Sequence, residues 1–150
     1  MPRRRGSFLG KAAFTVLAAL VVLTFLARRT GLVPDGDRAF DPGDYVDAPV
    51  VSAVEAGDLV GERAVVCGEV VNAVFARGTG GQPTFLNLER PYPDQPFDVV
   101  IWGRDRGRFD TPPETFYRNT RICAAGRITT HQGVPRIEAR EPEQIRLGRW

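Results

Sequence analysis

The feature that most restricts the fold is a long alternation of apolar and polar residues from Arg63 to Arg77, with Gly68 near its middle. Alternation with a period of two is typical of a β-strand, but this stretch is long for a single straight one. A glycine inside a strand marks a bulge or a sharp bend. We therefore expect one long strand that bends at Gly68 and serves two parts of a sheet.

A β-hairpin is expected next, with strands over residues 83–89 and 97–102. The first segment alternates large apolar with polar residues, and the second is dense in β-branched and aromatic residues, as strands are. The connection between them contains Pro91 and Pro93, which keep it out of any helix.

The hairpin has one face that is rich in rings and polar groups. If Leu86 and Leu88 point to the core, the period of two places the intervening residues on the opposite face. Those residues are Phe85, Asn87 and Glu89 in the first strand and Asp98, Val100 and Trp102 in the second. Two aromatic rings with an amide between them form a surface on which a base or a sugar can stack. The alternative is an ordinary core with Trp102 turned inward.

Flanking patterns complete the expected domain. Ser52 and Glu55 have the spacing of a capping box, which predicts the start of a short helix. The other expected elements are that helix over 53–59, a helical turn or two from Pro112, and strands over 120–130 and 134–139. An all-β chain with short helices, in which five strands are interrupted by one helix after the third, fits the OB-fold, a five-stranded Greek-key barrel.

The N-terminal part, residues 1–29, is a candidate membrane anchor. Its apolar run from Phe8 to Ala27 has 20 residues, about 30 Å as a helix, which is enough to cross a bilayer. Four basic residues lie before the run or near its start (Arg3, Arg4, Arg5 and Lys11), and two follow it. This favours a cytoplasmic N-terminus and an extracytoplasmic C-terminal domain in a single-pass, signal-anchored membrane protein. The alternative is a cleaved signal peptide, but the run ends without a small-x-small cleavage site.

Residues 30–49 are expected to be a flexible acidic linker to a folded domain over 50–150. This stretch has three prolines, three glycines and five aspartates, with only scattered apolar residues. Such a composition buries too little apolar surface to fold by itself.

The two cysteines, Cys67 and Cys123, fall in expected strands that are neighbours in an OB-fold. In an oxidising compartment they could form a disulfide if their side chains meet. The alternative is a pair of small buried thiols, which behave as hydrophobic residues.

Four segments together resemble the small bacterial OB-fold nucleic-acid-binding domain family, which occurs alone in exported proteins or beside nuclease domains. These segments are 65–70, 82–88, 99–103 and 121–128, and the likeness extends over about residues 50–146. The resemblance implies the OB-fold and a nucleic-acid-binding role. The nuclease members hold their chemistry in a separate domain that this stretch does not contain.

Charge permits a nucleic-acid ligand without requiring one. Residues 63–140 carry 11 arginines against 8 carboxylates, whereas residues 30–150 carry 14 against 18. Arginine can both stack on bases and fork to phosphates. Arginines on or beside the expected strands and loops are Arg77, Arg90, Arg104, Arg106, Arg127 and Arg136. The expected nucleic-acid-binding residues are Phe85, Asn87, Trp102, Arg77, Arg90, Arg104, Arg127 and Arg136; for each arginine the alternative is a solvated edge residue.

Catalytic patterns are missing from the sequence. The single histidine, His131, has no histidine or cysteine at ligand spacing, and the glycine-rich stretch 78–81 lacks the lysine of a phosphate-binding loop. We therefore expect a binding module rather than an enzyme, without metal or cofactor. The expected function is a membrane-tethered module for single-stranded DNA or RNA; the alternative is an envelope module that binds a protein or a glycan.

Overall fold

The long strand expected from the sequence is β2, Arg63–Phe75, in a computed structural model that describes residues 40–150. Its first half, to Glu69, pairs antiparallel with β5 (Arg121–Arg127), and its second half, from Val70, pairs antiparallel with β3 (Thr84–Leu88). The change of partner coincides with a register shift between Val70 and Asn72. The irregularity therefore lies at Val71 rather than at the predicted Gly68, which pairs in register with Ile122. A side chain on Gly68 would lie 2.9 Å from the Glu89 carboxylate.

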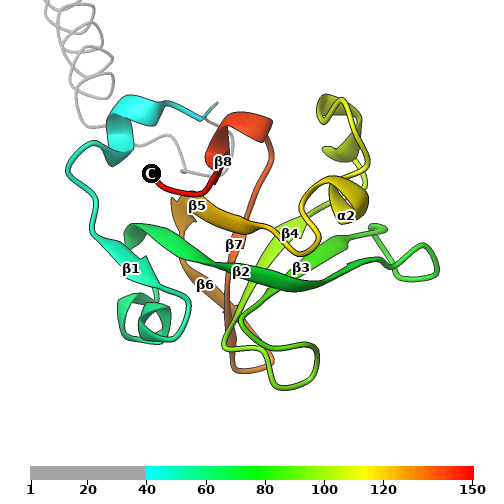
Figure 1. Cartoon of the computed structure of the whole chain (residues 1–150), viewed down its shortest axis with the longest axis horizontal. Helices are drawn as coiled ribbons and strands as arrows, with labels where there is room; N and C mark the ends of the chain where they lie inside the picture. The colour runs from blue at the N-terminus through cyan, green and yellow to red at the C-terminus, as the bar shows by residue number, and fades with distance from the viewer. Residues whose placement is uncertain (1–39) are drawn as a thin grey trace, which may run out of the picture. The chain divides into compact units, whose positions relative to one another are not determined.

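The described chain is mostly β structure with a few short helices, as expected (Figure 1). The remaining strands are β1 (Val50–Ser52), β4 (Phe97–Ile101), β6 (Thr129–His131), β7 (Val134–Glu138) and β8 (Ile145–Leu147). The helices are the 3-10 turns η1 (Pro42–Tyr45), η2 (Glu55–Leu59), η3 (Arg106–Arg108) and η4 (Pro142–Gln144), and the α-helical turn α2 (Pro113–Phe116). Both hairpin strands and the helical turn after Pro112 are therefore where the sequence places them. The short strands β1, β6 and β8 were not foreseen as separate elements.

The capping box at the start of η2 is confirmed. The Ser52 N–H donates to the Glu55 carboxylate at 3.0 Å, and the Glu55 N–H donates to the Ser52 hydroxyl at 3.4 Å. Hydrogen bonding to Ser52, through its side chain and then its backbone, lowers the pKa of Glu55. The helix that follows is a 3-10 turn from Glu55 rather than an α-helix from Ala53.

The prediction of a closed barrel is not confirmed. The strands form one eight-stranded sheet in the order β6-β7-β4-β3-β2-β5-β8, with β1 parallel to β2, and within the described chain its two ends do not pair. The break lies at Ile128, between β5 and β6, whose N–H donates to the Glu62 carbonyl and whose carbonyl accepts from the Gly61 N–H. These two hydrogen bonds continue the pairing with the β2 side past the end of β5. Strands β5 and β7 still approach closely, since a side chain on Gly126 would lie 2.5 Å from Ile137.

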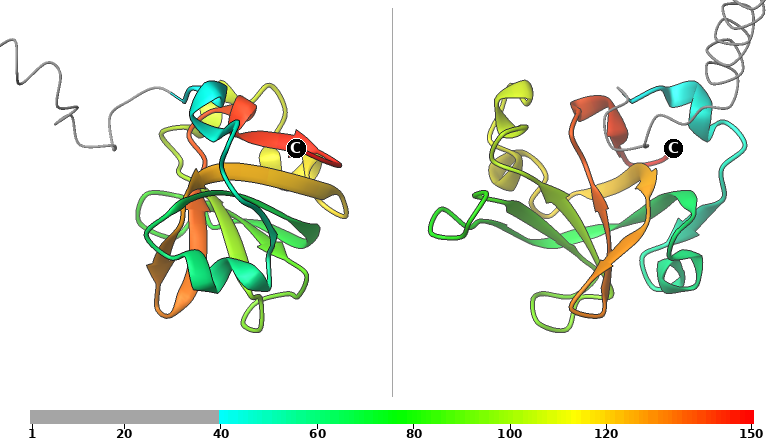
Figure 2. Two further views of the ribbon diagram at one scale, coloured as in Figure 1. Left: turned by 90° about the vertical axis from the view of Figure 1, so that its left-hand side faces the viewer. Right: turned by 180° about the vertical axis from the view of Figure 1, so that it is seen from behind.

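The main core lies on one face of this curved sheet. The alternation in the hairpin sends Leu86, Leu88, Val99 and Ile101 into it, all fully buried. Tyr117, after α2, joins the same cluster, and burial raises the pKa of its phenol above its ordinary value. Figure 2 shows the β3–β4 loop and the β6–β7 hairpin at one end of the sheet, away from α2.

A smaller apolar cluster covers the other face of the β2–β5 pair. Cys67 and Cys123 are opposite one another in the ladder and are joined by a disulfide. Tyr45, which stacks on Phe40 at 5.4 Å between ring centroids, and Trp150 both belong to this cluster. Segments from both ends of the described chain therefore pack around the disulfide.

Residues 40–49 differ from the expected flexible linker. They pack against the sheet through Phe40 and Tyr45, and the Val65 N–H donates to the Pro49 carbonyl at 2.9 Å. These two aromatic rings supply enough apolar surface to hold the stretch against the sheet, although it is rich in aspartate. Residues 1–39, with the candidate anchor and the first part of the expected linker, lie outside the described residues. Within residues 40–150, no helix is long and apolar enough to cross a membrane.

A buried amide ties the sheet together where it fails to close. Gln144, only 7% exposed, donates from its Nε2 to the carbonyls of Ala125 in β5 and Glu138 in β7, at 3.0 and 3.4 Å. Its Oε1 accepts from the N–H groups of Arg140 and Glu141, at 2.7 and 3.1 Å. One side chain thus binds four backbone groups, through one buried and three partly buried hydrogen bonds.

We expect Gln144→Ala to destabilise the domain by about 2–4 kcal/mol, because it leaves buried backbone donors and acceptors without partners. Thermal unfolding should show a fall in Tm of about 10 °C for a domain of this size. Glu143→Ala is the control, since Glu143 is exposed one residue earlier and should change Tm little. Equal effects of the two substitutions would contradict this role of Gln144.

Candidate ligand-binding face

The hairpin strands and their neighbours carry two rows of side chains on the face opposite the main core. The first row is called the apolar row because three of its four members are apolar. It crosses β2, β3, β4 and β7 through the successive partners Val74, Phe85, Val100 and Glu138. In the second, the polar row, the partners are Asn72, Asn87, Asp98 and Arg136. The structure therefore brings together Phe85, Asn87 and Arg136 from the predicted binding residues.

Trp102, also among the predicted residues, extends the same face beyond the end of β4. It follows Val100 by two residues and is half-buried. A side chain on Gly81 would lie 2.9 Å from its ring, so the loop between β2 and β3 passes close over the indole. The Arg136 guanidinium lies over the same ring, 5.9 Å from its centroid, within the range of a cation–π contact. Trp102 belongs to neither apolar core cluster.

The polar row is a buried hydrogen-bond network. The Asn87 amide donates to one oxygen of Asp98 at 2.7 Å, and the Gln95 amide donates to the other at 3.1 Å. Arg136 pairs with Glu138 at 3.2 Å. Asn87, Gln95 and Asp98 are each less than 8% exposed, so Asn87 is a support for Asp98 rather than a free amide.

Burial dominates the electrostatics of Asp98. It raises the pKa of the carboxyl above its ordinary value, against the opposing effects of the hydrogen bonds from Asn87 and Gln95 and of the Arg136 charge. Two buried atoms nearby, Gln95 Oε1 and Arg136 Nε, have no hydrogen-bond partner among the described residues. Both oxygens of Asp98 are therefore hydrogen-bonded, whereas Gln95 and Arg136 each keep one polar atom that is unpaired within the described chain.

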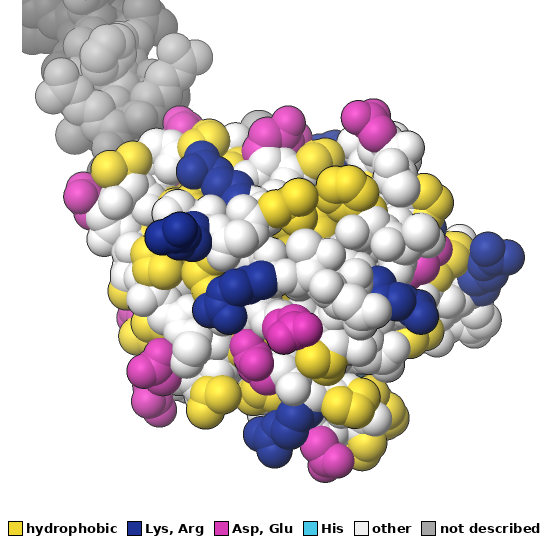
Figure 3. Space-filling view, in the orientation of Figure 1, with side chains coloured by type: hydrophobic (Ala, Val, Ile, Leu, Met, Phe, Trp, Pro, Cys, Tyr) yellow, Lys and Arg dark blue, Asp and Glu magenta, His cyan; other side chains and the backbone are white. Residues whose placement is uncertain are grey.

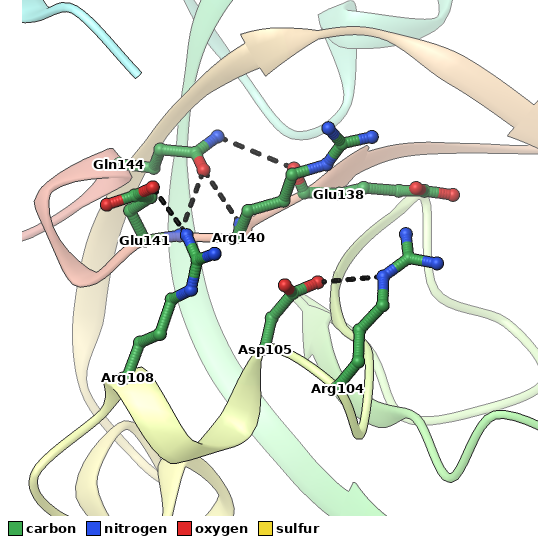
Figure 4. Close-up of polar contacts among 7 residues, drawn as sticks. All are labelled: Arg104, Asp105, Arg108, Glu138, Arg140, Glu141 and Gln144. Atoms are coloured by element: carbon green, nitrogen blue, oxygen red, sulfur yellow. Dashed lines mark hydrogen bonds and ion pairs between the residues drawn. The ribbon is translucent and has the colours of Figure 1, made fainter. Parts of the chain in front are cut away.

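The other predicted arginines are spread over the molecule. Arg77 lies 5.3 Å over the Phe75 ring, on the side of β2 opposite Val74. Arg90 is exposed in the β3–β4 loop, and Arg127 donates to the Gly61 carbonyl. Of these, only Arg104 lies close in the chain to Trp102. Its side chain is 68% exposed and pairs with Asp105 at 3.4 Å (Figure 4).

Arg106 has a structural role. Its guanidinium is 3.7 Å from the centroid of the Phe75 ring and forks to both oxygens of Glu114 at 2.7 and 3.2 Å. It also donates to the Thr84 hydroxyl. These hydrogen bonds from Arg106 lower the pKa of Glu114. The group fastens the β4–β5 connection to β2 and β3 rather than facing a ligand.

Sequence reasoning missed several members of the face, namely Asn72, Val74, Glu138 and Arg140. Glu138 and Arg140 are separated by one residue at the end of β7, so alternation in the last expected strand was the available signal. Figure 4 shows the Arg140 side chain, whose guanidinium has no hydrogen bond or ion pair among the residues that the structure describes. Glu89, expected on this face, instead has a left-handed backbone (φ 64°) and accepts from the Glu69 N–H.

Charge on the domain is mixed rather than strongly basic. Residues 40–150 carry 13 arginines against 16 carboxylates, a net of −3. Figure 3 shows basic and acidic side chains interspersed on the face in view. Across the described residues, no group of three or more histidine, cysteine or carboxylate side chains could hold a metal ion.

Comparison with known proteins leaves the family of the chain open. No protein-family model and no curated protein matches it. Two solved structures are similar in part. A putative aspartyl-tRNA synthetase from Leishmania major Friedlin matches 73% of this chain and 22% of its own, with 12% identity and a TM-score of 0.43. An OBody, AM1L10, bound to hen egg-white lysozyme, matches 63% of this chain and 86% of its own, with 18% identity and a TM-score of 0.38. Likenesses this weak carry no argument about function.

The raised pKa of Asp98 predicts how stability depends on pH. A carboxyl whose pKa is higher in the folded than in the unfolded protein stabilises the fold while protonated, and this contribution is lost as pH rises through the raised value. Asp98→Asn cannot ionise, so its Tm relative to the natural protein should increase from acidic to neutral pH. Thermal unfolding at a series of pH values measures this difference. A difference that stays constant or falls with pH would contradict the raised pKa.

Proposed function

We propose that residues 40–150 form a binding module of the OB type whose ligand is single-stranded nucleic acid. The topology supports the architecture. Strands β5 and β6 are separated by Ile128 alone, so the order β2-β3-β4-β7-β6 leads back along the chain to β5, which pairs with β2. A helical turn, α2, lies between β4 and β5. This is the strand order of a partly open five-stranded Greek-key barrel.

The observation that carries the ligand assignment is the surroundings of Trp102. Its indole and the Phe85 ring lie on one sheet face, with the Arg136 guanidinium over the indole. Arg104 is mostly exposed, and Arg140 has a guanidinium without a side-chain partner within the described chain. Aromatic rings that accept stacked bases, bordered by arginines that pair with phosphates, are what sequence-tolerant single-strand binders use.

An envelope glycan is the second candidate, and a carboxylate of the face favours it. Glu138, the accessible carboxylate, would repel phosphates but accept hydrogen bonds from sugar hydroxyls, and aromatic rings also pack against sugars. The two candidates differ in salt dependence. Displacing counterions from phosphates makes nucleic-acid affinity fall steeply as salt rises, which a neutral glycan does not show.

Trp102→Ala should weaken oligonucleotide binding about tenfold or more, because stacking contributes about 1–3 kcal/mol per base. Fluorescence anisotropy of a labelled oligonucleotide with the full chain in detergent, at two salt concentrations, measures this change. Trp150→Ala is the matched control, since Trp150 stacks with Arg146 at 4.2 Å in the other apolar cluster. Unchanged affinity in a folded Trp102→Ala variant would exclude the indole from the site, and no binding at low salt would overturn the nucleic-acid ligand.

We further propose that residues 1–29 anchor the protein in the cell membrane with the module outside the cytoplasm. The charge asymmetry around Phe8–Ala27 supports this orientation, and so does the disulfide, because such bonds persist in oxidising compartments.

The cysteines provide the test of this location. When the protein is taken from its membrane, unfolded and alkylated without reduction, mass spectrometry should find Cys67 and Cys123 unmodified. A variant without residues 1–29, retained in the cytoplasm, should have both thiols alkylated. Alkylation of both cysteines in the full chain would contradict an extracytoplasmic module.

A further inference from the structure

Glu138 occupies a distinctive place on the proposed nucleic-acid face. It ends the apolar row, with Val100 between it and Phe85. Neighbouring strands are about 4.8 Å apart, so the backbones at Phe85 and Glu138 are separated by about 10 Å. Val100 is fully buried between them. A base that stacks on Phe85 and extends across the sheet would therefore bring its edge to Glu138.

The carboxylate of this face that keeps free hydrogen-bonding capacity is on the same residue. Asp98 is 7% exposed, and both of its oxygens already accept hydrogen bonds, from Asn87 and Gln95. The Glu138 side chain is 30% exposed, and its ion pair with Arg136 uses Oε1. Asn87 donates inward to Asp98 rather than outward. The accessible acidic group in the two rows is thus Glu138, held in place by Arg136.

A carboxylate only accepts hydrogen bonds, through two oxygens side by side. On the Watson–Crick edge, guanine presents two neighbouring donors, N1–H and N2–H. Adenine and cytosine place a ring acceptor beside their amino group, and thymine or uracil places its N3–H between two carbonyls. Single-stranded ligands leave this edge open to be read. Guanine is therefore the base that complements an accessible carboxylate best.

We propose that Glu138 reads the Watson–Crick edge of a guanine stacked on Phe85, which gives the module a preference for guanine-containing single strands. This proposal rests on the nucleic-acid function proposed above. Arg136 is a positioning residue, since it holds Glu138 by the ion pair and lies over Trp102. A Glu138 that only fixes Arg136 would leave binding independent of base identity.

The experiment compares thymidine oligonucleotides of one length that differ at a single central base, measured by anisotropy with the full chain in detergent. An isolated guanine avoids quadruplex formation and keeps the number of phosphates constant. The guanine oligonucleotide should bind about tenfold more tightly than those with adenine, cytosine or thymine at that position. Glu138→Gln should abolish this preference without weakening binding to the all-thymidine strand, because an amide offers one acceptor and removes a repelling charge.

Glu143→Gln is the matched control, since it removes the same charge from an exposed residue on η4 and should keep the preference. Equal affinity for all four oligonucleotides, or a guanine preference that survives Glu138→Gln, would overturn the reading by Glu138 while leaving the nucleic-acid function intact. No binding of any oligonucleotide at low salt would instead overturn the nucleic-acid function itself.

Discussion

The described structure depends on the division of β2 between partners. Its first half pairs with β5 and β1, and its second half pairs with β3, with the change at the register shift between Val70 and Asn72. Because one continuous strand belongs to both parts, the two parts curve around a single core. The disulfide joins β2 to β5 within the first half, and Gln144 ties β5 to the end of β7. The disulfide thus reinforces an existing strand pair, whereas Gln144 connects two strands that have no backbone pairing with each other.

The second half of β2 supports the candidate face. There β2, β3, β4 and β7 are in register, so side chains far apart in the sequence form straight rows. The polar row is largely buried, and the hydrogen bond from Asn87 to Asp98 links β3 to β4 within it. Val74, Phe85 and Trp102 remain partly exposed to a ligand, whereas Val100 between the strands is buried. A face of this kind would bind a ligand by stacking on its aromatic rings and by contacts with a few charged side chains. A broad positive potential is not available, because the net charge of the domain is −3.

Several arginines that look equivalent in the sequence have different roles in the structure. Arg106 is held between Phe75 and Glu114, Arg127 meets a backbone carbonyl, and Arg136 spans Glu138 and Trp102. Only Arg104 and Arg140 combine a place near Trp102 or Glu138 with an exposed or unpaired guanidinium. An arginine count therefore overstates the basic surface that a polyanion would meet.

The sequence by itself determined the local elements of the described domain. Alternation, β-branched residues, prolines and the capping box depend on neighbouring residues, so the hairpin, the long bent strand and the start of η2 could be placed from them. The period of two also placed Phe85 and Asn87 opposite Leu86 and Leu88. Tertiary structure decided the rest, because those features depend on contacts between distant segments. Residues 61 and 62 bind the backbone of Ile128 between β5 and β6. Aromatic packing holds residues 40–49 against the sheet, and the parallel pairing of β4 with β7 brings Glu138 and Arg136 beside the hairpin.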